Sequence, residues 1–125
     1  MKKIIRTNQA PQPVGIYSQA VLASGFLFVS GQIAINPSTG KVETKDIKEQ
    51  TKQIMENIRH ILKQANMDFS NIVKATIFLT EMSNFSLVNE IYGSYFTSDF
   101  PAREIAQVCK LPLGVDIEIS VIACQ

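Results

Sequence analysis

Histidine and cysteine are scarce in this sequence of 125 residues, which contains one of the former and two of the latter. With His60 alone, no Ser-His-acid or Cys-His set is available for covalent catalysis. Cys109, Cys124 and His60 do not supply a usual tetrahedral zinc set either, so we expect no metal site. Charge of one sign is also lacking, since 12 basic and 11 acidic residues give a formal net charge of +1. This balance argues against a nucleic-acid-binding protein, which normally needs a concentrated basic face.

Long apolar runs are absent as well. A membrane-spanning helix needs about 20 apolar residues, whereas serines, glycines and a glutamine interrupt the most apolar stretch, residues 21–35. Residues 1–6 hold too few apolar side chains for a secretory signal, whose apolar segment has about 7–15 residues. We therefore expect a cytoplasmic protein that does not bind membranes, with Cys109 and Cys124 as buried, reduced thiols.

The composition indicates one globular domain over residues 1–125. Hydrophobic residues make up 46% of the chain and charged residues 18%, which is typical of a folded protein. No linker, repeat or low-complexity tract divides the sequence, and its length is that of one domain. A net charge near zero also means that the surface repels itself weakly, which permits self-association.

The hydrophobic pattern predicts two helices among about six strands. Apolar residues recur every three or four positions over residues 46–64, and Asp46 with Glu49 resembles a capping box. Ser83–Asn84 is expected to cap a second helix that reaches about Phe96 and turns its aromatic residues into the core. The strands are expected at residues 2–6, 19–24, 26–33, 72–81, 104–110 and 115–123.

This order of elements predicts an α+β sandwich, with both helices on one face of a mixed sheet. The other face would carry Phe28, Phe78 and Ile122. Such a face is too apolar for water, so we expect a homo-oligomer whose subunits cover it.

A few polar residues in apolar surroundings are candidates for chemistry. Arg103 follows a proline just before a strand, and a guanidinium on such a mount suits bidentate recognition of a carboxylate; a surface ion pair is the alternative. Glu118 lies between two isoleucines, and burial by a neighbouring subunit would raise its pKa toward acid–base use; a solvent-facing glutamate is the alternative. Tyr17 offers a hydroxyl at the end of a proline-rich loop, and Ser30–Gly31 would present a backbone N–H group to a ligand.

Several separated motifs follow one another along the chain: PVGIYSQA (13–20), FVSGQ (28–32), VNEIY (88–92), PAR (101–103), LPxG (111–114) and IEI (117–119). With them the sequence resembles the RidA, or YjgF-like, family of reactive intermediate deaminases over about residues 3–124. The resemblance implies a chorismate-mutase-like α+β fold, assembled as a homotrimer with three clefts between subunits. It also implies hydrolysis of 2-imino acids, formed from 2-aminoacrylate or 2-aminocrotonate, to 2-keto acids and ammonia without a cofactor.

The resemblance also assigns roles to matching positions. Arg103 would hold the substrate carboxylate, Glu118 would position the attacking water, and Tyr17 would orient the substrate. The other pocket positions, which would add backbone hydrogen bonds or line the cleft, are Gly31, Ser30, Asn89 and Ile105. The positions that depart from the usual family pattern, and so bear on substrate preference, are Ile16, Glu104, Ile105 and Ser120.

Three other functions remain as alternatives. A non-catalytic trimer of the same family, sensing a metabolite or binding a partner, would use Arg103 and not Glu118. Chorismate mutase chemistry needs several cations around a dianion, and the sequence has only three arginines. Ribonuclease activity would lack a catalytic histidine, because His60 is placed on the charged face of its helix.

Overall fold

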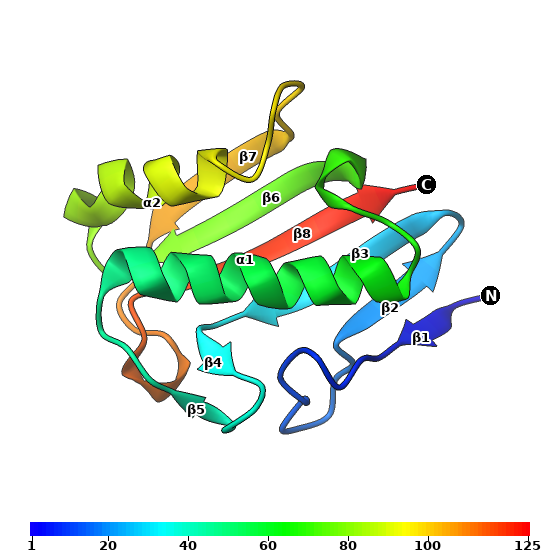
Figure 1. Ribbon diagram of the computed structural model, residues 1–125, viewed down its shortest axis with the longest axis horizontal. Coiled ribbons are helices and arrows are strands. Elements are labelled where there is room, and N and C mark those ends of the chain that lie inside the picture. The colour runs from blue at the N-terminus through cyan, green and yellow to red at the C-terminus, as the bar shows by residue number, and fades with distance from the viewer.

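The computed structural model describes residues 1–125 and contains a six-stranded sheet with two helices on one face (Figure 1). The strands of this sheet are β1 (Lys3–Ile5), β2 (Ala20–Ala23), β3 (Phe26–Gln32), β6 (Ile72–Leu79), β7 (Ala102–Gln107) and β8 (Ile117–Cys124). Their spatial order is β1-β2-β3-β8-β6-β7. Only β6 and β7 are parallel, so the sheet is mixed, as predicted.

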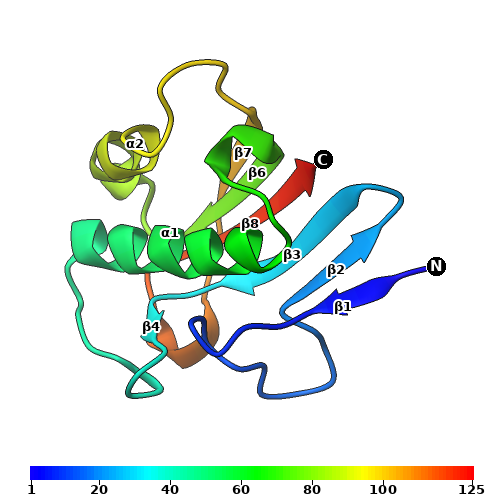
Figure 2. The same cartoon turned by 45° about the vertical axis from the view of Figure 1, so that its right-hand side comes forward.

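Both helices lie on the same side of the sheet (Figures 1 and 2). Helix α1 (Ile47–Gln64) runs across its middle, and helix α2 (Phe85–Gly93) lies beside α1 toward the β7 edge. The Asp46 carboxylate caps α1, since it accepts hydrogen bonds from the backbone N–H groups of Lys48 (2.8 Å) and Glu49 (3.3 Å). The fully buried side chains of α1 form the predicted apolar stripe: Thr51, Ile54, Met55, Ile58, Ile61 and Leu62.

The second helix differs from its prediction at both ends. It ends at Gly93 rather than near Phe96. The N–H groups of residues 94–96 donate to carbonyls three residues earlier, as in turns, and not four residues earlier, as in an α-helix. Asn84 makes no capping hydrogen bond, since a short 3-10 helix, η2 (Met82–Asn84), already leads into α2. The predicted cap at Ser83–Asn84 is therefore wrong.

Three further details were not expected from the sequence. A two-stranded hairpin, β4 (Ile35–Asn36) and β5 (Lys41–Val42), lies between β3 and α1, where no strand was predicted. Two more 3-10 helices, η1 (Phe69–Asn71) and η3 (Pro112–Gly114), precede β6 and β8. The cysteines are free, but Cys109 is exposed because it lies in the irregular segment after β7, and Cys124 is only half-buried. The prediction that both thiols are buried is wrong.

The sheet separates a buried core from an open face. Along β8, side chains alternate between full burial on the helix side and partial exposure on the other side. The strand register places Phe28 opposite Ile122, and Phe78 opposite Glu118. Phe28 is 46% exposed, so the open face is apolar, as predicted. No helix has the length and apolar character needed to cross a membrane.

Candidate functional site

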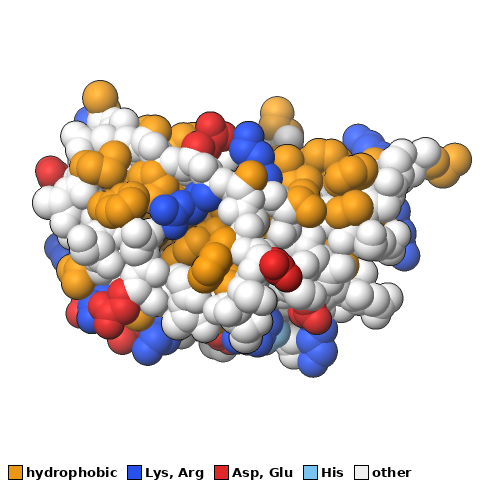
Figure 3. Space-filling view, turned by 90° about the horizontal axis from the view of Figure 1, so that it is seen from above, with side chains coloured by type: hydrophobic (Ala, Val, Ile, Leu, Met, Phe, Trp, Pro, Cys, Tyr) orange, Lys and Arg blue, Asp and Glu red, His pale blue; other side chains and the backbone are white.

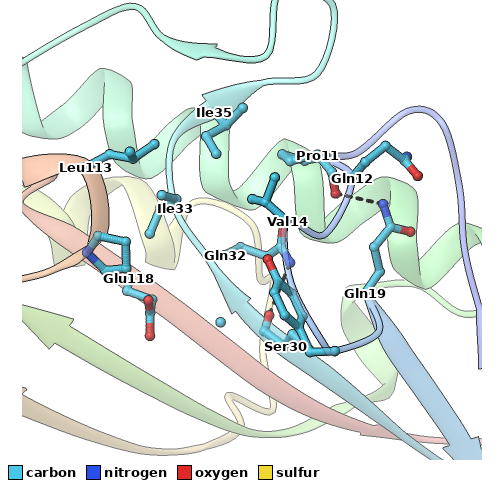
Figure 4. A pocket seen from close by; sticks show the side chains of 13 residues that line it. Pro11, Gln12, Val14, Gln19, Ser30, Gln32, Ile33, Ile35, Leu113 and Glu118 are labelled. Carbon is cyan, nitrogen blue, oxygen red and sulfur yellow. Dashed lines mark hydrogen bonds between the residues drawn. The ribbon is translucent and has the colours of Figure 1, made fainter.

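A cavity of about 560 Å³ opens at the end of the sheet where β3 leads toward β4 (Figure 4). Tyr17, Ser30, Gln32 and Glu118 contribute polar groups to its wall, and prolines and aliphatic side chains form much of the rest. No lysine, arginine or histidine lines the cavity. No group of three or more His, Cys, Asp or Glu side chains anywhere in the chain is arranged to hold a metal ion.

Glu118 is the acidic group of this cavity. Strand β8 carries it on the open face, opposite Phe78, where it is half-buried. Burial raises the pKa of the Glu118 carboxyl above its ordinary value of 4.5, because a desolvated carboxylate is disfavoured and no cation compensates its charge. A carboxyl group with a raised pKa is suited to both accepting and returning a proton near neutral pH.

Gly31 makes room for this carboxyl group. A Cβ atom at position 31 would lie 2.6 Å from Glu118 Oε2 and 2.8 Å from its Cδ, which is closer than non-bonded atoms approach. The β3–β8 ladder is irregular between Val29 and Gln32, so Gly31 lies in a bulged segment. The sequence suggested a backbone N–H role for Gly31, and the structure adds a steric one.

Gly31→Ala should therefore push the Glu118 carboxyl group out of its position. We expect the pKa of Glu118 to fall back toward 4.5, since the displaced group is better hydrated, and an NMR titration of the side-chain carboxyl carbons would measure it. Gly40→Ala is the matched control. Position 40 has nothing within 4 Å of a new Cβ and a φ of +72°, so this change should strain the backbone and leave the pKa of Glu118 unaltered. An unchanged Glu118 pKa in Gly31→Ala would contradict the steric role.

Ser30 and Gln19 hold the loop that brings Tyr17 to the cavity. Ser30 donates from its N–H to the Gln19 carbonyl (2.9 Å) and from its hydroxyl to the Ser18 carbonyl (2.5 Å). The Gln19 side chain is 2% exposed and donates to the Pro11 carbonyl (2.8 Å). Tyr17 itself is 52% exposed at the cavity edge. The structure therefore gives the Ser30 hydroxyl an anchoring contact.

Arg103 lies in a separate hollow on the helix side of β7. Its Nη1 donates to Asn89 Oδ1 at 2.7 Å, and its guanidinium carbon lies 5.2 Å from the ring centroid of Tyr92 and 5.7 Å from that of Phe85. No carboxylate pairs with it. The face that carries α2 and β7 shows a basic side chain set among hydrophobic ones (Figure 3). Arg103 is thus oriented by α2 and keeps donors free for a carboxylate.

The residues of α2 that contact Arg103 were only partly expected. Asn89 was predicted to line the pocket, whereas Phe85 and Tyr92 were assigned to the core. Tyr92 is 4% exposed, but Phe85 is 36% exposed and stacks near the guanidinium. Spacings of four and three residues place Phe85, Asn89 and Tyr92 on one helix face, which is the sequence signal that would have grouped them.

Arg103 and Glu118 lie on opposite faces of the sheet within one chain. Arg103 is in register with Ala75, which is fully buried on the helix side, and Glu118 is in register with Phe78 on the open face. Residues in register on neighbouring strands point to the same side. Within one chain the structure therefore separates two groups that the family resemblance assigns to a cleft between subunits.

The residues that depart from the family pattern lie in different surroundings. Glu104 points to the open face, where it pairs with Lys74 at 3.1 Å, so it is turned away from Arg103. Ile105 is half-buried and packs against the core. Ser120 lies on the open face, and Ile16 is fully exposed outside the cavity lining.

Comparison with known proteins places the chain in a family. The Endoribonuclease L-PSP family model matches residues 7–125. The human 2-iminobutanoate/2-iminopropanoate deaminase is 45% identical and is aligned over 100% of this chain and 91% of its own length. A RutC family protein of Pyrococcus horikoshii is 46% identical over 98% of both chains. A Yersinia pestis structure of the conserved Rid family has a TM-score of 0.98 and 47% identity, with 100% of both chains covered. This chain therefore belongs to the Endoribonuclease L-PSP family, which is the YjgF/RidA family.

Proposed function

We propose that the protein is a 2-imino acid deaminase, which hydrolyses 2-iminobutanoate and 2-iminopropanoate to 2-keto acids and ammonia. Its similarity to the human deaminase supports this reaction. One structural observation carries the proposal: an arginine without a carboxylate partner and a desolvated glutamate without a cation lie in two separate, incomplete half-sites.

The half-sites join when the β7 edge of one copy, which carries Arg103, meets the open face of another copy, which carries Glu118. Phe26, Phe28 and Val73 are 40–46% exposed, and association removes such surface from water. In a closed homotrimer, each cleft takes Glu118 and Tyr17 from one subunit and Arg103 and Asn89 from the next. Every subunit then contributes to two of the three clefts.

The chemistry requires few groups, because an imine carbon is already electrophilic. Arg103 binds the substrate carboxylate through two parallel N–H donors. Glu118 takes a proton from water as the oxygen adds to the carbon of the protonated imine, and the nitrogen keeps the C=N electron pair and becomes an amine. Glu118 then gives this proton to the amine nitrogen. The C–N bond breaks with its electrons on nitrogen, the hydroxyl proton passes back to the Glu118 carboxylate and from there to solvent, and ammonia leaves with the 2-keto acid formed. Tyr17, at the cavity edge, orients the substrate.

The nuclease activity named in the family description has no support at this site. No histidine lines either cavity, and His60 lies in a separate polar hollow between the N-terminal segment and the end of α1. The net charge of +1 also offers no general attraction for a polyanion.

Mixing two inactive variants tests the shared site. Measured at a substrate concentration below KM, Arg103→Ala and Glu118→Gln alone should each keep about 1% of the wild-type activity or less. After unfolding and joint refolding at equal amounts, a cleft is complete only when its arginine and its glutamate both come from unmutated positions. Random assembly gives 1/2 × 1/2, so about a quarter of the wild-type activity should return. Keto acid formation from imines generated by a serine or threonine dehydratase measures it.

Each variant refolded by itself is the control and should stay at about 1% of the wild-type activity or less. If mixed oligomers form, as judged by native mass spectrometry, and no activity returns, both residues act within one chain. If the wild type binds a 2-keto acid and accelerates no imine, the protein is a metabolite sensor rather than a deaminase.

A further inference from the structure

Leu113 has an unfavourable backbone conformation and an exposed apolar side chain. Its φ is +58° and its ψ is 17°, the left-handed region that residues with a Cβ normally avoid. Its side chain is 72% exposed, so core packing does not account for the strain. Strained residues of this kind cluster at binding and active sites, which makes Leu113 a candidate for contact with a ligand.

The side chain lines the Glu118 cavity. Figure 4 places Leu113 on the same side of the cavity as Glu118, with Ile33 and Ile35 next to it. These three side chains form an apolar wall, and such a wall favours an alkyl group over water.

The cavity is larger than the smallest imino acids need. 2-Iminobutanoate has seven non-hydrogen atoms and fills roughly 200 Å³, even if each takes the ~30 Å³ of a water molecule. The cavity measures about 560 Å³, which is within the range of sites for larger ligands. This volume belongs to the half-site of one chain, so a longer side chain fits beside Glu118 where the neighbouring subunit leaves the wall of Leu113, Ile33 and Ile35 open.

The loop that carries Leu113 is firmly held. Within it, the N–H of Gly114 donates to the Leu111 carbonyl (3.2 Å), and the next residue, Val115, is 3% exposed. The N–H of Asp116 donates to the Oε1 of Gln50 (3.1 Å), and Gln50 is 1% exposed. A fixed loop can present Leu113 at a defined position, as a specificity contact requires.

We propose that Leu113, Ile33 and Ile35 bind the substrate side chain, and that the protein prefers 2-imino acids with branched or longer apolar side chains to 2-iminopropanoate. This inference rests on the proposed deaminase function. An alkyl contact of this kind in an apolar pocket is worth tenfold or more in kcat/KM. Leu113 is thus a specificity-determining residue, whereas Arg103 and Glu118 serve every substrate.

The test compares imines made from leucine and from alanine by an L-amino-acid oxidase, which transfers two electrons from each amino acid to oxygen. Semicarbazide captures free imine as an ultraviolet-absorbing semicarbazone, so deaminase activity is measured as loss of semicarbazone. The wild type should act on the leucine-derived imine with about tenfold higher kcat/KM or more. Leu113→Ala and Leu113→Gly should lower that value about tenfold and change the value for the alanine-derived imine less than about twofold.

Two comparisons make the result decisive. Leu113→Gly removes the side chain and suits the left-handed backbone, so an effect shared with Leu113→Ala comes from the side chain and not from the loop. Leu87→Ala removes the same side chain from α2, 39% exposed and outside both cavities, and should leave both rates unchanged. A wild type that prefers the alanine-derived imine, or Leu113 variants with an unaltered ratio, would overturn the inference while the deaminase function stands. Failure to accelerate any imine would overturn both.

Discussion

Arg103→Ala is expected to lower kcat/KM for 2-iminobutanoate by about 10²- to 10⁴-fold. Two hydrogen bonds to the substrate carboxylate are lost, each worth about 1.5–3 kcal/mol for a charged partner. The carboxylate is bound before and during the reaction, so most of the loss should appear in KM. Steady-state kinetics on dehydratase-generated imine would measure the split.

Arg103→Lys should recover only part of this loss. Lysine keeps the charge but lacks the planar fork that a carboxylate binds, and it stacks less well on the rings of Tyr92 and Phe85. Arg59→Ala is the matched control, because Arg59 also lies over two aromatic rings, those of Phe69 and Tyr95, and lines neither cavity. Full activity in Arg103→Ala would remove Arg103 from the site and with it the proposed binding mode.

Glu118→Gln should lower kcat by about 10²- to 10⁴-fold, the usual contribution of a positioned acid–base group. In the wild type, kcat/KM should rise with pH as Glu118 loses its proton, with an apparent pKa above 4.5 because burial raises it. The residual activity of Glu118→Gln should be flat over the same range. If the rise of kcat/KM with pH persisted in Glu118→Gln, the group that loses its proton would be a residue other than Glu118.

The same substitution should increase stability at neutral pH. A carboxyl with a raised folded pKa binds its proton more tightly in the folded state, so the folded protein loses stability as pH rises from about 4.5 through the folded pKa. Glutamine has no charge to desolvate. The Tm of Glu118→Gln should therefore exceed that of the wild type at pH 7 and match it well below pH 4.5. Calorimetry at several pH values would show the difference, and equal Tm values at pH 7 would contradict a destabilising carboxylate.

Regular elements were predictable because each depends on a local pattern. Helix α1 follows from its apolar period and from Asp46, whose cap lies within three residues. The open face follows from strand alternation, which places Phe28 and Ile122 on one side. The hairpin of β4 and β5 was missed because strands of two residues are too short for a pattern. Strand β7 starts at Ala102, two residues before the predicted start at residue 104. Its parallel pairing with β6 sets this start, because the first pair is Lys74 with Ala102.

The candidate site residues were named from the sequence, whereas their geometry was not. Motif spacing identified Arg103 and Glu118, but the face on which each lies depends on strand register, which links residues far apart in the chain. The contact between Gly31 and Glu118 joins segments 87 residues apart through a bulge. The ring contacts of Arg103 required the packing of α2 against β7. Tertiary arrangements of this kind leave no local trace in a sequence.

The close fit between Gly31 and Glu118 also restricts how the sequence can change. Any side chain at position 31 collides with the acid at position 118, so neither position is free to vary on its own without loss. Once the acid at position 118 is lost, a larger residue can replace Gly31. Restoring the acid then requires a change at position 118 and a return to glycine at position 31. A larger residue at position 31 therefore makes the loss of the acid hard to reverse. Among descendants of this protein, we expect glycine at position 31 wherever glutamate is kept at position 118.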